Sequence, residues 1–146
     1  MGNYGEHANH VPRLQQSLGH SSCGAILATL EELARPLAAQ SAHLHSIVGR
    51  IRPSVEALIE SDFRHDHEAL VRRAVRANIR ASADHLRHGS QVIEQLIQTE
   101  GLLVVGAEYS LETGIVDFFD GVPDAIGDEI QRPLLAAPLV ERSPIT

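Results

Sequence analysis

Apolar residues recur at every third or fourth position through the first half of the chain, a period that predicts amphipathic helices. The first helix is expected to start at Gly24, and Pro36 interrupts it or marks its end. A second helix is expected over about Ala42–Ile51, and Pro53 fits the first turn of a further short helix. This part of the chain therefore predicts three helices, separated at the prolines.

The longest helical pattern runs from about His67 to His88. Gly89 fits the left-handed position after the end of this helix, and Ser90 fits the N-cap of the next one. That next helix is expected to end near Gly101. The polar residues between the two patterns therefore predict a short connection.

After Gly101 the apolar pattern changes from helical to extended. Leu102–Val105 is fully apolar, as in a strand that is buried on both faces. Glu112–Gly114 is a turn with glycine at its end, and Ile115–Phe119 can form a second strand. Residues 102–119 are therefore predicted to form a β-hairpin.

These elements indicate one helix-rich α/β domain over residues 20–122, in which the hairpin is part of a short sheet. Residues 1–19 are polar without a clear period, so we expect an irregular segment in which a short strand or helix is only weakly specified. Residues 123–146 contain several prolines and are expected to be a tail, mostly loop with one short helix.

Composition limits the possible partners. The formal net charge is −7, every basic residue is an arginine, and tryptophan is absent. Nucleic-acid binding is therefore not expected, because it depends on basic grooves and aromatic stacking platforms. The chain has no apolar run long enough to span a membrane and no recognisable secretory signal, so we expect a cytoplasmic protein.

The clearest chemical signal is the segment Gly19-His20-Ser21-Ser22-Cys23-Gly24-Ala25, which contains the single cysteine of the chain. An imidazole nitrogen and a thiolate are donors that suit Zn²⁺, so His20 and Cys23 are candidate metal ligands. Cys23 directly precedes a predicted helix, whose free amides and dipole favour a thiolate. Gly24 would allow a bound molecule to approach the backbone closely, which makes it a candidate substrate-binding residue.

Other interpretations of this segment remain open. A buried cysteine is most often a small packed side chain, and a Cys23–His20 dyad could also serve as a thiol nucleophile. A third zinc ligand would have to come from elsewhere, for example from His7 or His10.

The remaining charged residues and histidines are expected to be structural. Arg72, Arg76 and Arg80 share one helix face, which we interpret as a solvated face balanced by nearby acids. Glu31-Glu32 is interpreted in the same way. The acids of the last predicted strand are interpreted as an alternating strand end, and the other histidines as surface or capping residues: Asp117, Asp120, His43, His45, His65, His67, His85 and His88.

The motif Gly19–Ala25 resembles the second metal-binding motif of β-class carbonic anhydrases, in which the histidine and the cysteine both bind zinc. The segment from Leu103 to Gly114 resembles the late strand and turn of that family, and Ile51-Arg52-Pro53 and Val75–Ile79 agree in order. The resemblance covers roughly residues 18–122. It implies a C-terminal part of that fold, zinc as cofactor, and CO₂ and bicarbonate as substrate and product.

The resemblance also has a gap. The family has an upstream Cys-x-Asp-x-Arg segment that supplies another thiolate and an Asp–Arg pair, and this sequence contains no such segment. The catalytic residues are therefore unassigned, and we expect a truncated homologue with impaired activity. Related substrates such as COS or CS₂, and a non-catalytic structural or oligomerising module, are the alternatives. Because family members are dimers or larger, a homo-oligomer is expected.

Overall fold

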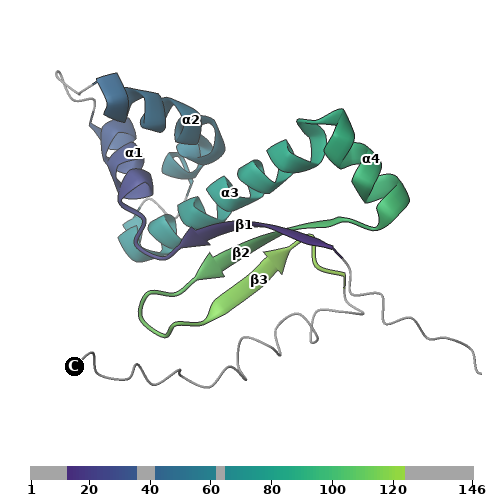
Figure 1. Cartoon of the computed structure of the whole chain (residues 1–146). Coiled ribbons are helices and arrows are strands. Elements are labelled where there is room, and N and C mark those ends of the chain that lie inside the picture. Colours follow the sequence, from purple (N-terminus) through teal and green to yellow (C-terminus); the bar gives the residue numbers. More distant parts are fainter. Residues whose placement is uncertain (1–12, 36–41, 62–64, 124–146) are drawn as a thin grey trace, which may run out of the picture.

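The computed structural model describes residues 13–35, 42–61 and 65–123. Three strands form one sheet in the order β1-β2-β3: β1 is Leu14–His20, β2 is Leu103–Tyr109 and β3 is Val116–Asp120. β1 and β2 are parallel, whereas β2 and β3 are antiparallel and form the predicted hairpin. The four helices of the described residues lie on one side of this sheet (Figure 1).

The helices build a core above the sheet, with α3 in direct contact with it. α3 spans His67–His88 and crosses both β1 and β2, while α1 (Gly24–Ala34) and α2 (Ala42–Ile59) pack together and against α3. The central apolar cluster takes residues from all three helices: Ile26, Leu30, Ile51, Val55, Leu70, Ala74, Val75 and Ile79. The predicted helical stripes are therefore the surfaces that pack together.

A smaller cluster lies on the sheet itself. Val105, Ala107 and Phe118 are buried there. Side chains alternate along a strand, and Glu108 on β2 contacts α3, so Val105 and Ala107 face away from that helix. Both faces of β2 are thus apolar and buried, as its continuous apolar run predicts.

α2 differs from the prediction, because one continuous helix replaces the two that were expected around Pro53. A proline inside a helix removes the hydrogen bond to the carbonyl four residues earlier and presses on that carbonyl. Here that residue is Gly49, which is exposed, so water can reach its carbonyl. The hydroxyl of Ser54 also donates to the carbonyl of Ile51 at 2.7 Å. The helix therefore continues through the proline.

α4 spans Gln91–Glu100, with Ser90 at its N-cap as predicted. Gly89 is not left-handed, since its φ is −89°. A Cβ at Gly89 would lie 2.4 Å from the carbonyl oxygen of His85, so close approach explains this glycine. The left-handed residue is Gly101, after α4.

β1 is the second departure from the sequence pattern. Residues 14–19 were expected to be irregular, but Leu14–His20 forms a regular strand paired with β2 from Leu14↔Leu103 to His20↔Tyr109. Most of its side chains are exposed, so the strand has no buried alternation that a sequence pattern could reveal.

None of the described helices combines the length and apolarity needed to cross a membrane.

Candidate metal-binding turn and adjoining cleft

The two predicted zinc ligands lie at the ends of a tight turn between β1 and α1. His20 is the last residue of β1, and Cys23 is the N-cap of α1. Ser21 ties this turn to the end of β2: its N–H donates to the carbonyl of Tyr109, and its hydroxyl accepts from the N–H of Leu111, both at 2.9 Å. The turn therefore has a fixed position at the carboxyl ends of the two parallel strands.

Ser22 adopts a left-handed conformation, with φ of 60°. For a residue other than glycine this conformation costs of the order of 1 kcal/mol, and such residues are often found at functional sites. The hydrogen bonds of Ser21 hold the chain before this serine, and the helical hydrogen bond that the carbonyl of Cys23 accepts from Leu27 holds the chain after it. The sequence pattern gave no sign of this strained position.

Cys23 has the helix-terminal position that the sequence predicts. Its carbonyl accepts the first helical hydrogen bond of α1, from the N–H of Leu27 at 3.0 Å, and its side chain makes no capping hydrogen bond. The thiol is free and half-buried, and it packs against the central apolar cluster. The packed and the metal-binding interpretations of Cys23 therefore both fit this position.

His20 is exposed, and its Nδ1 lies 2.8 Å from the carbonyl oxygen of Ser21. When Nδ1 carries the proton and donates to this carbonyl, the lone pair of Nε2 is free to bind a metal ion. Hydrogen bonds of this kind commonly orient histidine ligands.

Gly24 begins α1 and is exposed, and a Cβ built there would meet no atom within 4 Å. The structure therefore leaves room for a side chain at this position. Close approach of the backbone is instead required at Gly19, where a Cβ would lie 2.7 Å from side-chain carbons of Ile79. Gly19 thus lets β1 lie directly on α3 and positions His20, its neighbour in sequence.

The imidazole of His20 and the thiol of Cys23 are donor types that suit zinc, but they are fewer than a zinc site normally has. Among residues 13–35, 42–61 and 65–123, no group of three or more His, Cys, Asp or Glu side chains could hold a metal ion. A catalytic zinc normally has three protein ligands, and the turn supplies a histidine and a cysteine. His7 and His10 lie outside the described residues.

A cleft of about 520 Å³ adjoins the turn. Ser21 and Ser22 line one wall, and residues of α3 and of the β2–β3 hairpin line the others, among them Val75, Arg76 and Glu108. Neither His20 nor Cys23 is a lining residue.

Arg76, which lines this cleft, joins α3 to the hairpin. Its guanidinium donates to Glu108 at 2.8 Å and also to Asp117, and lies over the ring of Phe119 at 4.5 Å from the ring centre. Burial lowers the pKa of Arg76, but hydrogen bonds and charges from Glu108 and Asp117 outweigh this and raise it overall. Arg76 is therefore charged at any physiological pH.

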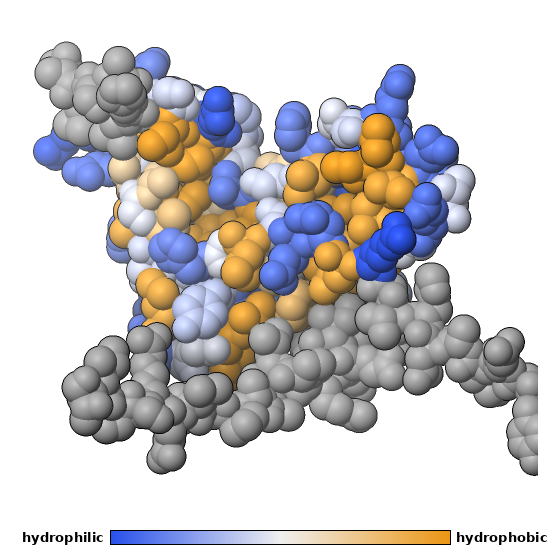
Figure 2. Space-filling model, viewed as in Figure 1, coloured by the Kyte–Doolittle hydropathy of each residue, from blue (hydrophilic) through white to orange (hydrophobic). Residues whose placement is uncertain are grey.

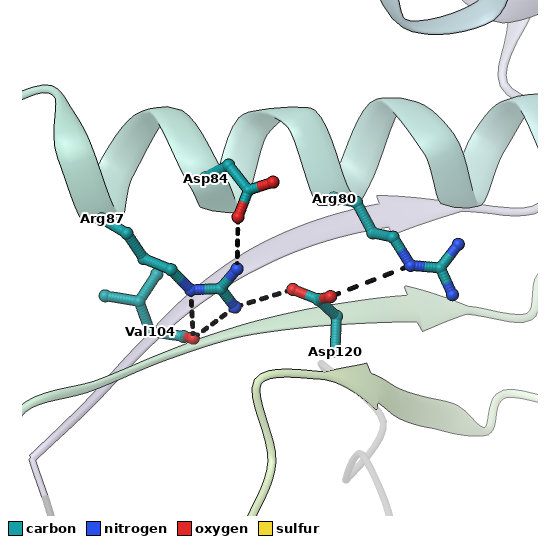
Figure 3. Close-up of polar contacts among 5 residues, drawn as sticks. All are labelled: Arg80, Asp84, Arg87, Val104 and Asp120. Carbon is teal, nitrogen blue, oxygen red and sulfur yellow. Dashed lines mark hydrogen bonds and ion pairs between the residues drawn. The ribbon is translucent and has the colours of Figure 1, made fainter.

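Arg87 makes a similar link from the last turn of α3 (Figure 3). It donates to Asp120 of β3 at 2.7 Å, to Asp84 at 2.7 Å and to the carbonyl of Val104 at 2.8 Å. Asp120 also pairs with Arg80 at 3.8 Å. Burial opposes the charge of Arg87, but Asp120 and Asp84 raise its pKa overall.

These contacts confirm the prediction for the arginine face only in part, since its arginines are balanced by acids but some of those acids lie on the sheet. Arg72 fits it, since this exposed residue pairs with Glu68 along the helix. Arg76 and Arg80 instead reach the sheet, and Asp117 and Asp120 are their partners rather than a simple strand end. The sequence did contain a signal for these pairs, namely acids on the predicted hairpin and a row of arginines on the long helix. The helical period alone, however, does not determine which face of that helix contacts the sheet.

Glu32 is also different from the prediction. It is only 9% exposed, with Arg52 at 3.5 Å, and its second carboxylate oxygen is buried without a partner in the described part of the chain. Glu31, its neighbour, is exposed as expected. His45, His65, His67, His85 and His88 are exposed, as predicted, and the side chain of His43 lies outside the description.

Comparison with known proteins places this architecture in a family. The family model described as carbonic anhydrase matches residues 16–116. No significant match was found among curated proteins. Solved structures give the same result at the level of fold.

The β-carbonic anhydrase CcaA has 24% sequence identity and a TM-score of 0.57, over 75% of this chain and 52% of that one. A tetrameric β-carbonic anhydrase from Sordaria macrospora has 21% identity and a TM-score of 0.57, over 73% and 52%. The β-carbonic anhydrase CafA of Aspergillus fumigatus has 19% identity and a TM-score of 0.59, over 82% and 54%.

The present chain thus spans about half the length of these structures. Its helix-rich layer and short sheet correspond to that part of the β-carbonic anhydrase fold, as the resemblance of the His20–Cys23 motif and the hairpin implies. With the family match covering most of the described residues, the chain belongs to the carbonic anhydrase family.

Proposed function

We propose that this chain is a zinc-binding β-class carbonic anhydrase homologue in which reversible hydration of CO₂ to bicarbonate is strongly reduced. The observation that supports this proposal is the ordered turn with His20 at one end and Cys23 at the other, at the start of α1. When bound, zinc would supply a hydroxide from water at neutral pH. His20 and Cys23 would hold the ion, and no further step is assigned to it because the donor set is incomplete.

The reduced activity follows from ligand number and from the missing acid–base partners. The sequence has one cysteine, so a second thiolate from the same chain is not available. Catalytic metal sites also depend on surrounding groups that orient ligands and bound water. The carboxylates near the cleft, Glu108 and Asp117, are already engaged by Arg76.

Zinc titration followed by metal analysis tests the binding half of the proposal. We expect weak binding by the wild-type chain, with a free energy far below the roughly 10–16 kcal/mol of a full structural site. Cys23→Ser should abolish binding, because no other thiolate can replace it. His85→Ala is the matched control: this exposed histidine of α3 should not affect binding. Tight binding that survives Cys23→Ser would place the metal elsewhere and overturn the proposal.

A stopped-flow assay with a pH indicator tests the catalytic half. The zinc-loaded chain should hydrate CO₂ at a rate orders of magnitude below that of an efficient zinc enzyme, whose turnover approaches about 10⁶ s⁻¹. A zinc-dependent rate in the efficient range would contradict the proposal. A chain that binds no zinc and has no activity would favour the second candidate, a non-catalytic structural or oligomerising module. The absence of a three-donor cluster among the described residues favours that candidate.

A further inference from the structure

Ser21 directly follows β1, and its N–H, its carbonyl and its hydroxyl each have a hydrogen-bonding partner. The N–H donates to the carbonyl of Tyr109, and the hydroxyl accepts from the N–H of Leu111, both at 2.9 Å. The carbonyl oxygen lies 2.8 Å from Nδ1 of His20. Because a carbonyl oxygen only accepts, this last contact is a hydrogen bond when Nδ1 carries the proton of the ring. One residue thus joins the end of β2 to the imidazole of His20.

The hydroxyl of Ser21 takes a place that a backbone carbonyl normally fills. In a parallel pair, a bonding residue donates its N–H to one carbonyl of the neighbouring strand and accepts at its own carbonyl from the N–H two residues further along. The pairing of β1 with β2 runs to His20↔Tyr109, and the N–H of Ser21 extends it by reaching the carbonyl of Tyr109. The donor of the next rung is therefore the N–H of Leu111, and it bonds to the hydroxyl of Ser21.

This substitution separates two tasks that one carbonyl could not perform alone. The side chain of Ser21 completes the ladder with β2, and its carbonyl is left to accept from the ring of His20. The backbone changes direction at the same point, since the next residue, Ser22, has a φ of 60°. The strand therefore ends at the peptide whose carbonyl contacts His20.

We propose that Ser21 is a positioning residue for His20. Its hydroxyl replaces its own carbonyl in the β1–β2 ladder, and the released carbonyl keeps the proton of the neutral imidazole on Nδ1. The partner of one ring nitrogen determines which tautomer a histidine adopts, so Nε2 keeps the lone pair that a metal ion requires. The consequence for zinc rests on the proposed function, whereas the tautomer of His20 is a property of the metal-free chain.

Nitrogen-15 NMR of the metal-free chain measures this tautomer directly. The ring signals of His20 are identified by their loss in His20→Ala. In alkaline buffer, in which histidine rings are neutral, the wild-type ring should carry its proton mainly on Nδ1, whereas an unconstrained histidine favours Nε2. In Ser21→Ala the carbonyl of residue 21 can return to the ladder and accept from Leu111, so the ring should shift toward the form protonated on Nε2.

Two further variants separate the positioning role from a general loss of structure. Ser21→Thr keeps a hydroxyl at the same place and should retain the wild-type tautomer. Ser110→Ala is the matched control, because the hydroxyl of Ser110 accepts from the N–H of Thr113 within the hairpin, at 3.2 Å. This variant loses a hydroxyl of the same kind from the same region and should leave the His20 ring unchanged.

Zinc titration of the same variants gives a second readout. Removing the group that orients a metal ligand weakens metal binding about 10- to 100-fold, so Ser21→Ala should bind zinc at least about tenfold more weakly than the wild type, Ser21→Thr or Ser110→Ala. A wild type that binds no zinc would contradict the proposed function, and the tautomer would still decide the role of Ser21.

Three results would each overturn the inference. The first is a wild-type His20 ring that carries its proton on Nε2. The second is a Ser21→Ala variant that keeps the wild-type tautomer, or whose tautomer changes no more than that of Ser110→Ala. The third is a wild type that binds zinc with an affinity that Ser21→Ala leaves unchanged.

Discussion

The two outer strands of the described sheet are attached to the rest of the molecule in opposite ways. β3 is joined to α3 by charged contacts: Arg76 binds Asp117, and Arg87 and Arg80 both reach Asp120. β1 has no ion pair to α3 and lies against it through the bare backbone of Gly19. Charged side chains therefore cover the β3 side, whereas β1 keeps an uncharged edge and carries the His20–Cys23 turn.

The difference shows that two strands of one sheet can be held against the same helix by different kinds of contact. Ion pairs hold β3 through side chains that can be removed one at a time. β1 is positioned by steric fit and by its backbone pairing with β2. Its position therefore depends on the lack of a side chain at Gly19. The following two changes test each kind of attachment.

The largest effect is expected on the β3 side, for Arg87→Met. The side chains of Arg87 and Asp120 are 20% and 19% exposed, so the substitution leaves a mostly buried carboxylate without its closest partner. Loss of one member of a buried pair costs about 3 kcal/mol. Urea unfolding should therefore show a lower free energy of unfolding by about that amount.

Arg72→Met is the matched control for this change. Arg72 lies on the same helix and pairs with Glu68 in an exposed pair, so its removal should cost at most about 0.5 kcal/mol. Equal losses for Arg72→Met and Arg87→Met would show that the β3 links contribute no more than surface charges.

A smaller effect is expected on the β1 side, for Gly19→Ala. The added Cβ would lie 2.7 Å from carbons of Ile79, so β1 or α3 must shift, at a cost of about 1–2 kcal/mol. Thermal unfolding checks this loss. In a double-mutant cycle, Ile79→Ala should reduce the cost of Gly19→Ala, because the carbons that it meets are gone. Strictly additive effects of the two substitutions would contradict the steric explanation.

The sequence predicted those elements whose apolar residues are buried with a clear period. α3 and the β2–β3 hairpin were predicted closely, since Leu70, Val75 and Ile79 face the core and Val104 and Val105 are buried. β1 was missed because its exposed side chains have no such period. α2 was divided at Pro53 because the tolerance of that proline depends on the exposure of Gly49.

For the candidate site, the sequence predicts local positions, whereas the role of His20 and Cys23 as metal ligands stays a prediction. His20, Cys23 and the start of α1 follow from local sequence, and the structure places them at the two ends of the turn. The links from Arg76 to Asp117 and from Arg87 to Asp120 join residues far apart in the chain. Such pairs depend on how α3 crosses the sheet, which the pattern of either segment alone does not determine.

The parallel pairing of β1 and β2 also affects how the molecule is made. Leu14 pairs with Leu103, and all four helices lie between them in sequence. Contacts between distant residues form slowly, because a long loop must close first, whereas the β2–β3 hairpin is local. During synthesis β1 leaves the ribosome well before β2, the strand with which it pairs. Throughout that interval the edge of β1 that pairs with β2 in the folded chain lacks that partner, so correct pairing of β1 depends on the completion of β2.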